Sequence, residues 1–135
     1  MAELSDVKVI SIRQPWASMI AEGRKSIEVR KWKTNYRGAI YIHAARSVDW
    51  EAYEEFFNGV PFHMPLGYII AKANLTEVRD YKKVHDFIAD ETRHLNSIER
   101  YPDGGCYGFV LKCIEKTKQV PLRGRLNIFE TKLSI

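Results

Sequence analysis

The side chains of this chain that could do chemistry are concentrated between Ile10 and Ala45. This stretch contains Trp16 and Trp32, a series of lysines and arginines, and only two carboxylates. Cations attract phosphates, aromatic faces stack on bases, and a carboxylate among them can orient a donor or move a proton. We therefore expect the functional residues of the chain in this segment.

The alternation within residues 26–32 predicts a strand with one apolar and one polar face. Ile27 and Val29 point one way, and Glu28 and Arg30 point the other way. The two-residue repeat places Glu28 and Arg30 about 7 Å apart on the polar face. A direct ion pair is the simplest interpretation. It is compatible with a site in which the carboxylate accepts hydrogen bonds from a ligand and the guanidinium meets a phosphate or a base edge.

Lys25 follows Gly23, which is expected to end a short helix, and it precedes the strand that carries Glu28. At the mouth of this turn a lysine could contact a phosphate. Partial burial would lower its pKa and let it act as a base. A solvated loop lysine is the simpler alternative from the residues alone.

The aromatic candidates differ in their spacing. Trp16 recurs with Met19 and Ile20 at helical intervals, which favours core packing over base stacking. Trp32 lies on the polar face of its strand, a position that fits partial exposure and ligand contact about as well as burial. Tyr107 adds an aromatic ring to the same surface only if the fold closes on itself.

The remaining candidates carry weaker signals. Arg37 precedes Gly38, where the backbone can approach a ligand closely, and a plain turn explains the pair equally well. His43 is more typical of a hydrogen-bonded strand histidine than of a catalyst. Arg123 and Arg125 flank a glycine and would extend the basic surface if the chain ends meet.

Periodicity and turn residues predict the elements that must position these side chains. Strands are expected at residues 7–12, 26–32, 39–45, 67–78, 106–115 and 126–132, and helices at residues 15–22, 50–58 and 82–98. Prolines and glycines predict a loop over residues 58–67 and a turn over residues 119–125. The order lacks a βαβ rhythm and predicts an α+β fold, a small mixed β-barrel of five to six strands with two to three peripheral helices.

Length and composition favour one soluble domain over residues 1–135. The chain is 45% hydrophobic but has no apolar run of the roughly 20 residues that a membrane helix needs. The acidic start does not resemble a secretory signal, so we expect a cytoplasmic protein. The four histidines are not spaced as metal ligands, and we predict neither a metal nor another cofactor. Cys106 and Cys113 are expected on opposite faces of one strand, which argues against a disulfide.

Charge is distributed unevenly along the chain. Residues 1–47 hold nine basic and four acidic residues, residues 48–104 hold six and eleven, and residues 105–135 hold six and two. If the two basic ends meet in space, they form one positive face with an acidic face behind it. This arrangement favours a nucleic-acid partner, although chance segregation on a solvated surface is the alternative.

The segment SIRQPWASMIAEGRKSIEVRKWKTNYRGAIYIHAA resembles the signature of ASCH domains, which are small PUA-like barrels. The shared marks are the QPWA helix, a GxKxxExR motif, a tryptophan, YRG, and an IHAA-type strand. Further on, GYIIAKANLTEV and YGFVLKCIEKTKQVPLRGRLNIFE are similar to the central and closing strands of that family. The resemblance implies a cleft beside the GxKxxExR motif and, in general, RNA binding. At Lys25 it also favours a ligand contact over a solvated lysine.

The leading hypothesis is an RNA-binding module whose cleft takes a nucleotide or single-stranded RNA. Phosphates would meet Lys25, Arg30 and Arg37, and a base would stack on Trp32 or Tyr107. The partner is therefore expected to be RNA or a nucleotide, and the oligomeric state stays open. The full set of candidate binding residues is Trp16, Lys25, Glu28, Arg30, Trp32, Arg37, His43 and Tyr107.

The second hypothesis is an enzyme. Some ASCH proteins resemble amidohydrolases that deacylate a modified cytidine with a lysine, a threonine three residues later and a distant glutamate. Lys25 matches the lysine, but Glu28 occupies the threonine position, so Lys25 and Glu28 are the catalytic candidates and the expected hydroxyl is missing. Ser26 is displaced from that position, and Glu77 and Glu91 are both candidates for the distant acid.

Two further alternatives remain. A ribonuclease would use Lys25, Glu28 and His43 as its acid and base groups, although no known nuclease spacing supports it. A protein-interaction module is the alternative without catalysis or RNA, and it is favoured if the cleft is apolar.

Overall fold

The computed structural model of the chain describes residues 3–134. Its strands are β1 (Leu4–Gln14), β2 (Ile27–Arg30), β3 (Gly38–Val48), β4 (Tyr68–Tyr81), β5 (Cys106–Pro121) and β6 (Ile128–Ser134). Its helices are α1 (Trp16–Ala21), α2 (Trp50–Phe57), α3 (Val84–Ala89), α4 (Glu91–His94) and the 3-10 turn η1 (Ile98–Arg100). The predicted α+β class, with a mixed sheet and a few short helices, is confirmed.

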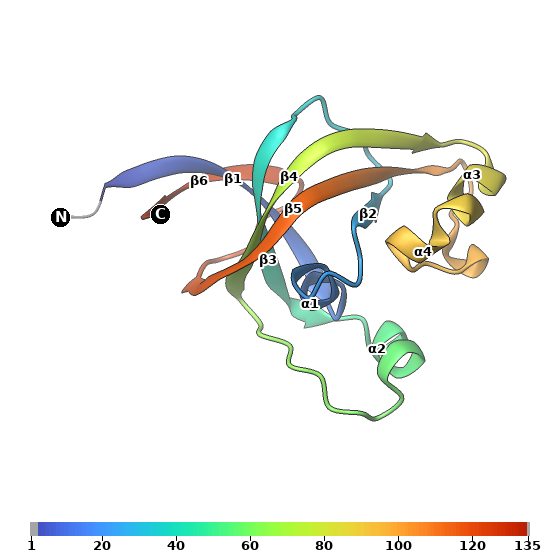
Figure 1. Cartoon of the computed structure of the whole chain (residues 1–135), viewed down its shortest axis with the longest axis horizontal. Coiled ribbons are helices and arrows are strands. Elements are labelled where there is room, and N and C mark those ends of the chain that lie inside the picture. The colour runs from blue at the N-terminus through green and yellow to red at the C-terminus, as the bar shows by residue number, and fades with distance from the viewer. Residues whose placement is uncertain (1–2, 135) are drawn as a thin grey trace.

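The six strands form one sheet in the order β2-β5-β4-β3-β1-β6. β1 and β3 are parallel, and the other neighbours are antiparallel. Figure 1 shows the strongly curved strands, with the first strand, β1, and the last strand, β6, side by side. Within the described residues, β2 and β6 are the edge strands and share no ladder, so backbone hydrogen bonds do not close the barrel.

Helix α1 belongs to the core of the fold. It contacts β1, β3, β4 and β5. Trp16, Ala17, Met19 and Ile20 all belong to the main buried cluster. The sequence WASMIA has no charged side chain, and a helix that is apolar on nearly every side is buried on nearly every side. The burial expected from the Trp16 spacing is confirmed.

The single helix predicted over residues 82–98 is wrong. The segment is divided into α3, α4 and η1, and Leu95 has a left-handed backbone with φ of 64°. A hydrogen bond from outside the segment holds this break, because Lys25 Nζ donates to the His94 carbonyl that ends α4. An apolar period of helical length does not reveal such an interruption.

Several strand boundaries also differ from those predicted. β1, β3, β4 and β5 are longer, and β5 runs to Pro121, into the predicted turn over residues 119–125. Irregularities in the β4–β5 register interrupt the side-chain alternation without ending the pairing. Both cysteines are free, with Cys106 buried and Cys113 exposed. No helix within residues 3–134 is long and apolar enough to cross a membrane.

Candidate functional site

Two adjoining cavities lie where β1 and β2 approach each other. The first, called here the inner cavity, has a volume of about 470 Å³. The second, called the arginine cavity, has a volume of about 1030 Å³. Ser11, Arg13 and Arg30 line both of them, so the two cavities adjoin along these three residues.

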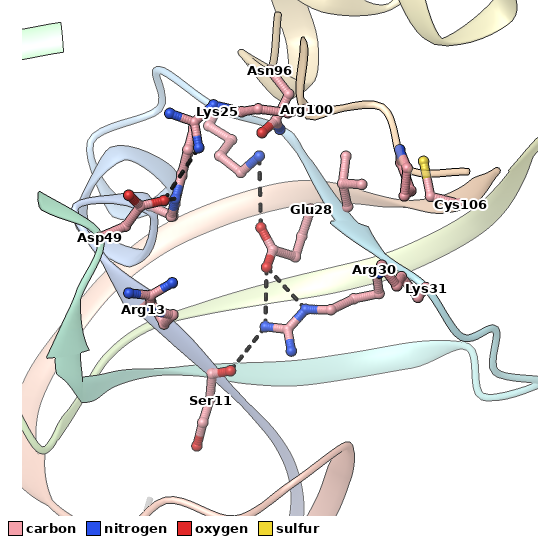
Figure 2. A pocket seen from close by; sticks show the side chains of 13 residues that line it. Ser11, Arg13, Lys25, Glu28, Arg30, Lys31, Asp49, Asn96, Arg100 and Cys106 are labelled. Carbon is pink, nitrogen blue, oxygen red and sulfur yellow. Dashed lines mark hydrogen bonds and ion pairs between the residues drawn. The ribbon is translucent and has the colours of Figure 1, made fainter. Parts of the chain in front are cut away.

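Lys25, Glu28 and Arg30 form a chain of ionic contacts on the floor of the inner cavity. Glu28 Oε1 lies 3.6 Å from Lys25 Nζ, and Glu28 Oε2 lies 3.0 Å from both Arg30 Nε and Arg30 Nη2. Arg30 Nη2 also donates to the Ser11 carbonyl at 2.9 Å, as Figure 2 shows. The Glu28–Arg30 pair expected from the strand repeat is confirmed. Because Ser11 belongs to β1, Arg30 links β2 to β1 across the open side of the sheet.

The structure buries Lys25 instead of leaving it at a solvated turn. Its side chain is 1% exposed, and Nζ donates to the His94 carbonyl at 2.6 Å. The ammonium also lies 4.8 Å from the centroid of the Trp16 ring. Burial lowers the pKa of Lys25 to about 8 and outweighs the opposing effect of Glu28. Lys25 is thus a desolvated amine at the cavity wall, which suits proton transfer or hydrogen bonding to a ligand.

Asp49 and Arg100 complete the inner cavity, and the sequence-based candidates did not include them. Asp49 Oδ2 accepts from Trp16 Nε1 at 3.0 Å and from Arg100 Nη1 at 3.3 Å. Asp49 Oδ1 accepts from the amide of Ala52 and so caps α2. Burial opposes ionisation, but these hydrogen bonds and the charge of Arg100 lower the pKa of Asp49 overall. In the sequence, Asp49 stands directly before the helix predicted over residues 50–58, which indicates a helix cap and nothing more, and Arg100 lies in the acidic middle of the chain.

Trp16 offers little free surface for stacking. It is 9% exposed, and the edge of Phe56 packs against it with ring centroids 5.5 Å apart. The Arg100 guanidinium lies 5.3 Å from the Trp16 centroid, in addition to the Lys25 ammonium. The indole therefore acts as a support for the cations of the inner cavity.

Arginines dominate the second cavity. The five that line it are Arg13, Arg30, Arg46, Arg123 and Arg125. None of the lining residues within the described part of the chain is an aspartate or glutamate. The five arginines come from β1, β2, β3 and the β5–β6 turn. The basic segments 1–47 and 105–135 therefore meet on one face of the fold, as predicted. The arrangement attracts anions.

His43 and Trp32 also line the arginine cavity. His43 is 1% exposed, with Nε2 2.6 Å from the Leu122 carbonyl and Nδ1 2.9 Å from Ser11 Oγ. A carbonyl can only accept, so Nε2 donates, and burial lowers the pKa of the ring. His43 is the hydrogen-bonded strand histidine that its context favoured. Trp32, for which the sequence leaves exposure and burial open, is half-buried, and it packs edge-on against Phe109 with ring centroids 5.0 Å apart.

Two candidate binding residues lie outside both linings. Arg37 is exposed and its Nη1 donates to the carbonyls of Thr34 and Tyr36, within its own turn. Tyr107 is half-buried on β5, opposite Arg30 in the register, and packs against the main core. The structure therefore does not bring these two side chains to the cavities.

The other residues that the two enzyme hypotheses require lie away from Lys25 and Glu28. Glu77 pairs with exposed Arg79 at 3.1 Å in a different hollow, and Glu91 lies in the first turn of α4. Neither lines the inner cavity, where Asp49 is the second carboxylate beside Glu28. His43 lines the arginine cavity, whereas Lys25 and Glu28 line the inner one. Among residues 3–134, no group of three or more His, Cys, Asp or Glu side chains could hold a metal ion.

Comparisons with known proteins agree with this architecture. The family model of the ASCH domain matches residues 10–120. Activating signal cointegrator 1 from Homo sapiens is 46% identical over 35 residues, which are 26% of this chain and only 6% of that protein. The crystal structure of ASCH from Zymomonas mobilis aligns with a TM-score of 0.61 and 20% identity over 85% of this chain and 73% of that one. A mutant of the same protein aligns with a TM-score of 0.62 over 85% of this chain and 75% of its own, at 20% identity.

Proposed function

The chain belongs to the ASCH domain family, and from this membership we propose that its two adjoining cavities form one cleft that binds single-stranded RNA or a nucleotide. The observation behind this proposal is that Arg13 and Arg30 line both cavities. Arg13 and Arg30 stand between a cavity rich in hydrogen-bonding groups and a cavity without carboxylates among the described residues. This combination matches a ligand that has a polar base at one end and phosphates at the other.

The inner cavity has side chains that could hydrogen-bond to a nucleobase. Its wall offers the Lys25 amine and the Asn96 side chain, whose Nδ2 already donates to the His94 carbonyl. The Asn96 Oδ1 atom can therefore accept from a base edge, while Glu28 keeps Lys25 and Arg30 in place. Trp32, at the junction beyond Arg30, is the aromatic side chain with surface left for stacking.

Arg13 provides the most direct test of the cleft. It lines both cavities, and among the described residues its guanidinium makes one hydrogen bond, a donation from Nη2 to the Val48 carbonyl at 3.0 Å. Arg13→Gln is expected to weaken binding of a labelled single-stranded RNA about tenfold, because the variant cannot make a charged hydrogen bond to the ligand. The slope of log K against log salt should fall by about 0.7 for each phosphate that the variant no longer neutralises. Fluorescence anisotropy at several salt concentrations measures both quantities.

Lys132→Gln is the matched control. It removes the same charge from an exposed lysine that pairs with Asp6 on β1, outside both cavities. The control is expected to bind like the wild type apart from a small uniform electrostatic effect. Equal losses of affinity in the two variants, or no loss in either, would contradict the assignment of the cleft.

A second candidate function is the deacylation of a modified cytidine. It is favoured by one observation, the placement of the desolvated Lys25 amine, with a pKa of about 8, beside the Glu28 carboxylate in a cavity. Glu28 replaces the hydroxyl nucleophile, so it would activate a water and Lys25 would stabilise the oxyanion. Ser26 does not line this cavity. Incubation with acylated cytidine followed by mass spectrometry tests the idea, and Glu28→Gln should abolish any deacylation.

The ribonuclease alternative has less support. It needs Lys25, Glu28 and His43 around one scissile bond, and both ring nitrogens of His43 already bond to Leu122 and Ser11. Loss of RNA length on a denaturing gel during the binding experiments is the observation that would revive it.

A further inference from the structure

The turn between β5 and β6 is fixed against the floor of the arginine cavity. The Leu122 carbonyl accepts from His43 Nε2 at 2.6 Å, and the Leu122 amide donates to the Gly67 carbonyl at 3.1 Å. A Cβ atom on Gly124 would lie 2.8 Å from Ser11 Oγ and 3.0 Å from His43 Cε1. The backbone at Gly124 therefore lies directly against Ser11 and His43, and a larger residue there would require these side chains or the turn to shift.

This turn places Arg123 and Arg125 at the arginine cavity, which Arg46 of β3 lines as well. Arg123 and Arg125 flank the seated glycine, and the Arg46 guanidinium lies over Gly67, where a Cβ would be 3.2 Å from Arg46 Cζ. The turn is thus an anchored support for Arg123 and Arg125 instead of a free loop.

These three arginines carry charge that the described part of the chain does not neutralise. Arg30 is paired with Glu28, but Arg46, Arg123 and Arg125 have no ion pair with an aspartate or glutamate among residues 3–134. Three guanidinium groups around one carboxylate-free cavity repel one another. An anion with a single negative charge offsets only part of that repulsion, whereas an anion with two or more charges offsets most of it.

We propose that the arginine cavity binds a phosphate group that carries more than one negative charge, either the phosphomonoester at an RNA chain end or the phosphates of a free nucleotide. The proposal rests on the RNA-binding function argued above. A phosphodiester within a chain carries one charge, but a phosphomonoester carries about −1.5 to −2 near neutral pH and presents three acceptor oxygens. Planar guanidinium groups bind such oxygens in pairs, so three arginines suit a terminal phosphate.

The test compares the affinities of one short RNA sequence that carries different groups at its ends. The sequence is prepared with a 5′-hydroxyl, a 5′-phosphate or a 3′-phosphate, and binding is measured by anisotropy. Isothermal titration with a nucleoside and with its mono- and triphosphate distinguishes a chain end from a free nucleotide. At least one phosphorylated ligand is expected to bind about tenfold or more tightly than its hydroxyl counterpart, since charged hydrogen bonds are added.

The double variant Arg123→Gln/Arg125→Gln should remove this preference, so that phosphorylated and hydroxyl-ended forms of the RNA bind to it with affinities within about twofold of each other. Lys116→Gln/Lys132→Gln is the control, because it removes two charges from exposed lysines that pair with Glu22 and Asp6 outside both cavities. Circular dichroism verifies that each variant is folded.

Each outcome bears on the proposal. A phosphate preference that disappears only in the arginine double variant supports it, and the ligand series identifies the source. Equal binding of all ends and no gain from added phosphates overturns it while leaving the RNA-binding function standing. Absence of binding to every RNA and nucleotide overturns both proposals together.

Discussion

Lys25 is buried beside a carboxylate that does not compensate fully for its lost hydration. The distance of 3.6 Å to Glu28 Oε1 is long for an ion pair, and the shorter contact, 2.6 Å, goes to a neutral carbonyl. Burial therefore dominates and lowers the pKa of Lys25 from 10.5 to about 8. Near neutral pH this lysine keeps its proton, but it loses that proton far more readily than an exposed lysine does.

The shift predicts a pH-dependent stability. Between pH 8 and pH 10.5 the unfolded chain holds a proton on Lys25 that the folded chain has released, so the free energy of unfolding should rise with pH across this window. Relative to Lys25→Met, the wild type is expected to gain up to about 3 kcal/mol. Urea denaturation of both proteins at the two ends of the window measures this difference.

Exposed Lys116 provides the control for that experiment. Its salt-bridge partner Glu22 is also exposed, and Lys116→Met should leave the pH dependence of the wild type unchanged. If Lys25→Met and the wild type show parallel curves, the amine is not desolvated in the way that the structure indicates.

At the scale of the elements, the Arg30 side chain gives β2 a link to β1. Among the described residues, β2 pairs in the sheet with β5 alone and also contacts α4, and Arg30 ties it to β1 through the Ser11 carbonyl. The same guanidinium holds Glu28. The position of the candidate cleft between the two strands therefore depends on Arg30, whether or not this residue also contacts a phosphate.

Arg30→Gln is expected to loosen β2 locally. Removal of a charged hydrogen bond should raise the hydrogen-exchange rates of the backbone amides in Ile27–Arg30 about tenfold and should change those in β6 little. Arg79→Gln is the matched control, since Arg79 pairs with Glu77 two residues earlier in β4 just as Arg30 pairs with Glu28. Exchange that rises equally across the sheet, or does not rise in β2, would contradict this role.

Local patterns in the sequence predicted contacts between near neighbours and missed contacts between distant ones. The Glu28–Arg30 pair and the buried face of α1 follow from spacings of two to four residues. The burial of Lys25 depends on a carbonyl 69 residues away, and the bond from Arg100 to Asp49 spans 51 residues. Periodicity contains no information about such pairs, so it leaves a solvated and a partly buried Lys25 both open and gives no reason to select Arg100.

Across the whole molecule, opposite charges gather at opposite ends. The turn that carries Arg123 and Arg125 lies toward the termini, whereas α3 lies at the far end of the β4–β5 ribbon, as Figure 1 shows. The hollow beside α3 is lined by four carboxylates, Glu77, Asp80, Asp86 and Asp90, together with Arg79. A polyanion is therefore attracted to one end and repelled from the other, which orients its approach to the cleft.

A nuclear magnetic resonance titration of the labelled protein with a short single-stranded RNA tests directly whether this cleft binds RNA. We expect amide shifts to concentrate in Ser11, Arg13, Arg30 and Trp32 and in residues 43–47 and 122–127, and added salt to weaken them. Shifts that gather instead around exposed Trp50, Val60 and Leu66, or an RNA that causes no shifts, would contradict the central claim that this cleft binds RNA.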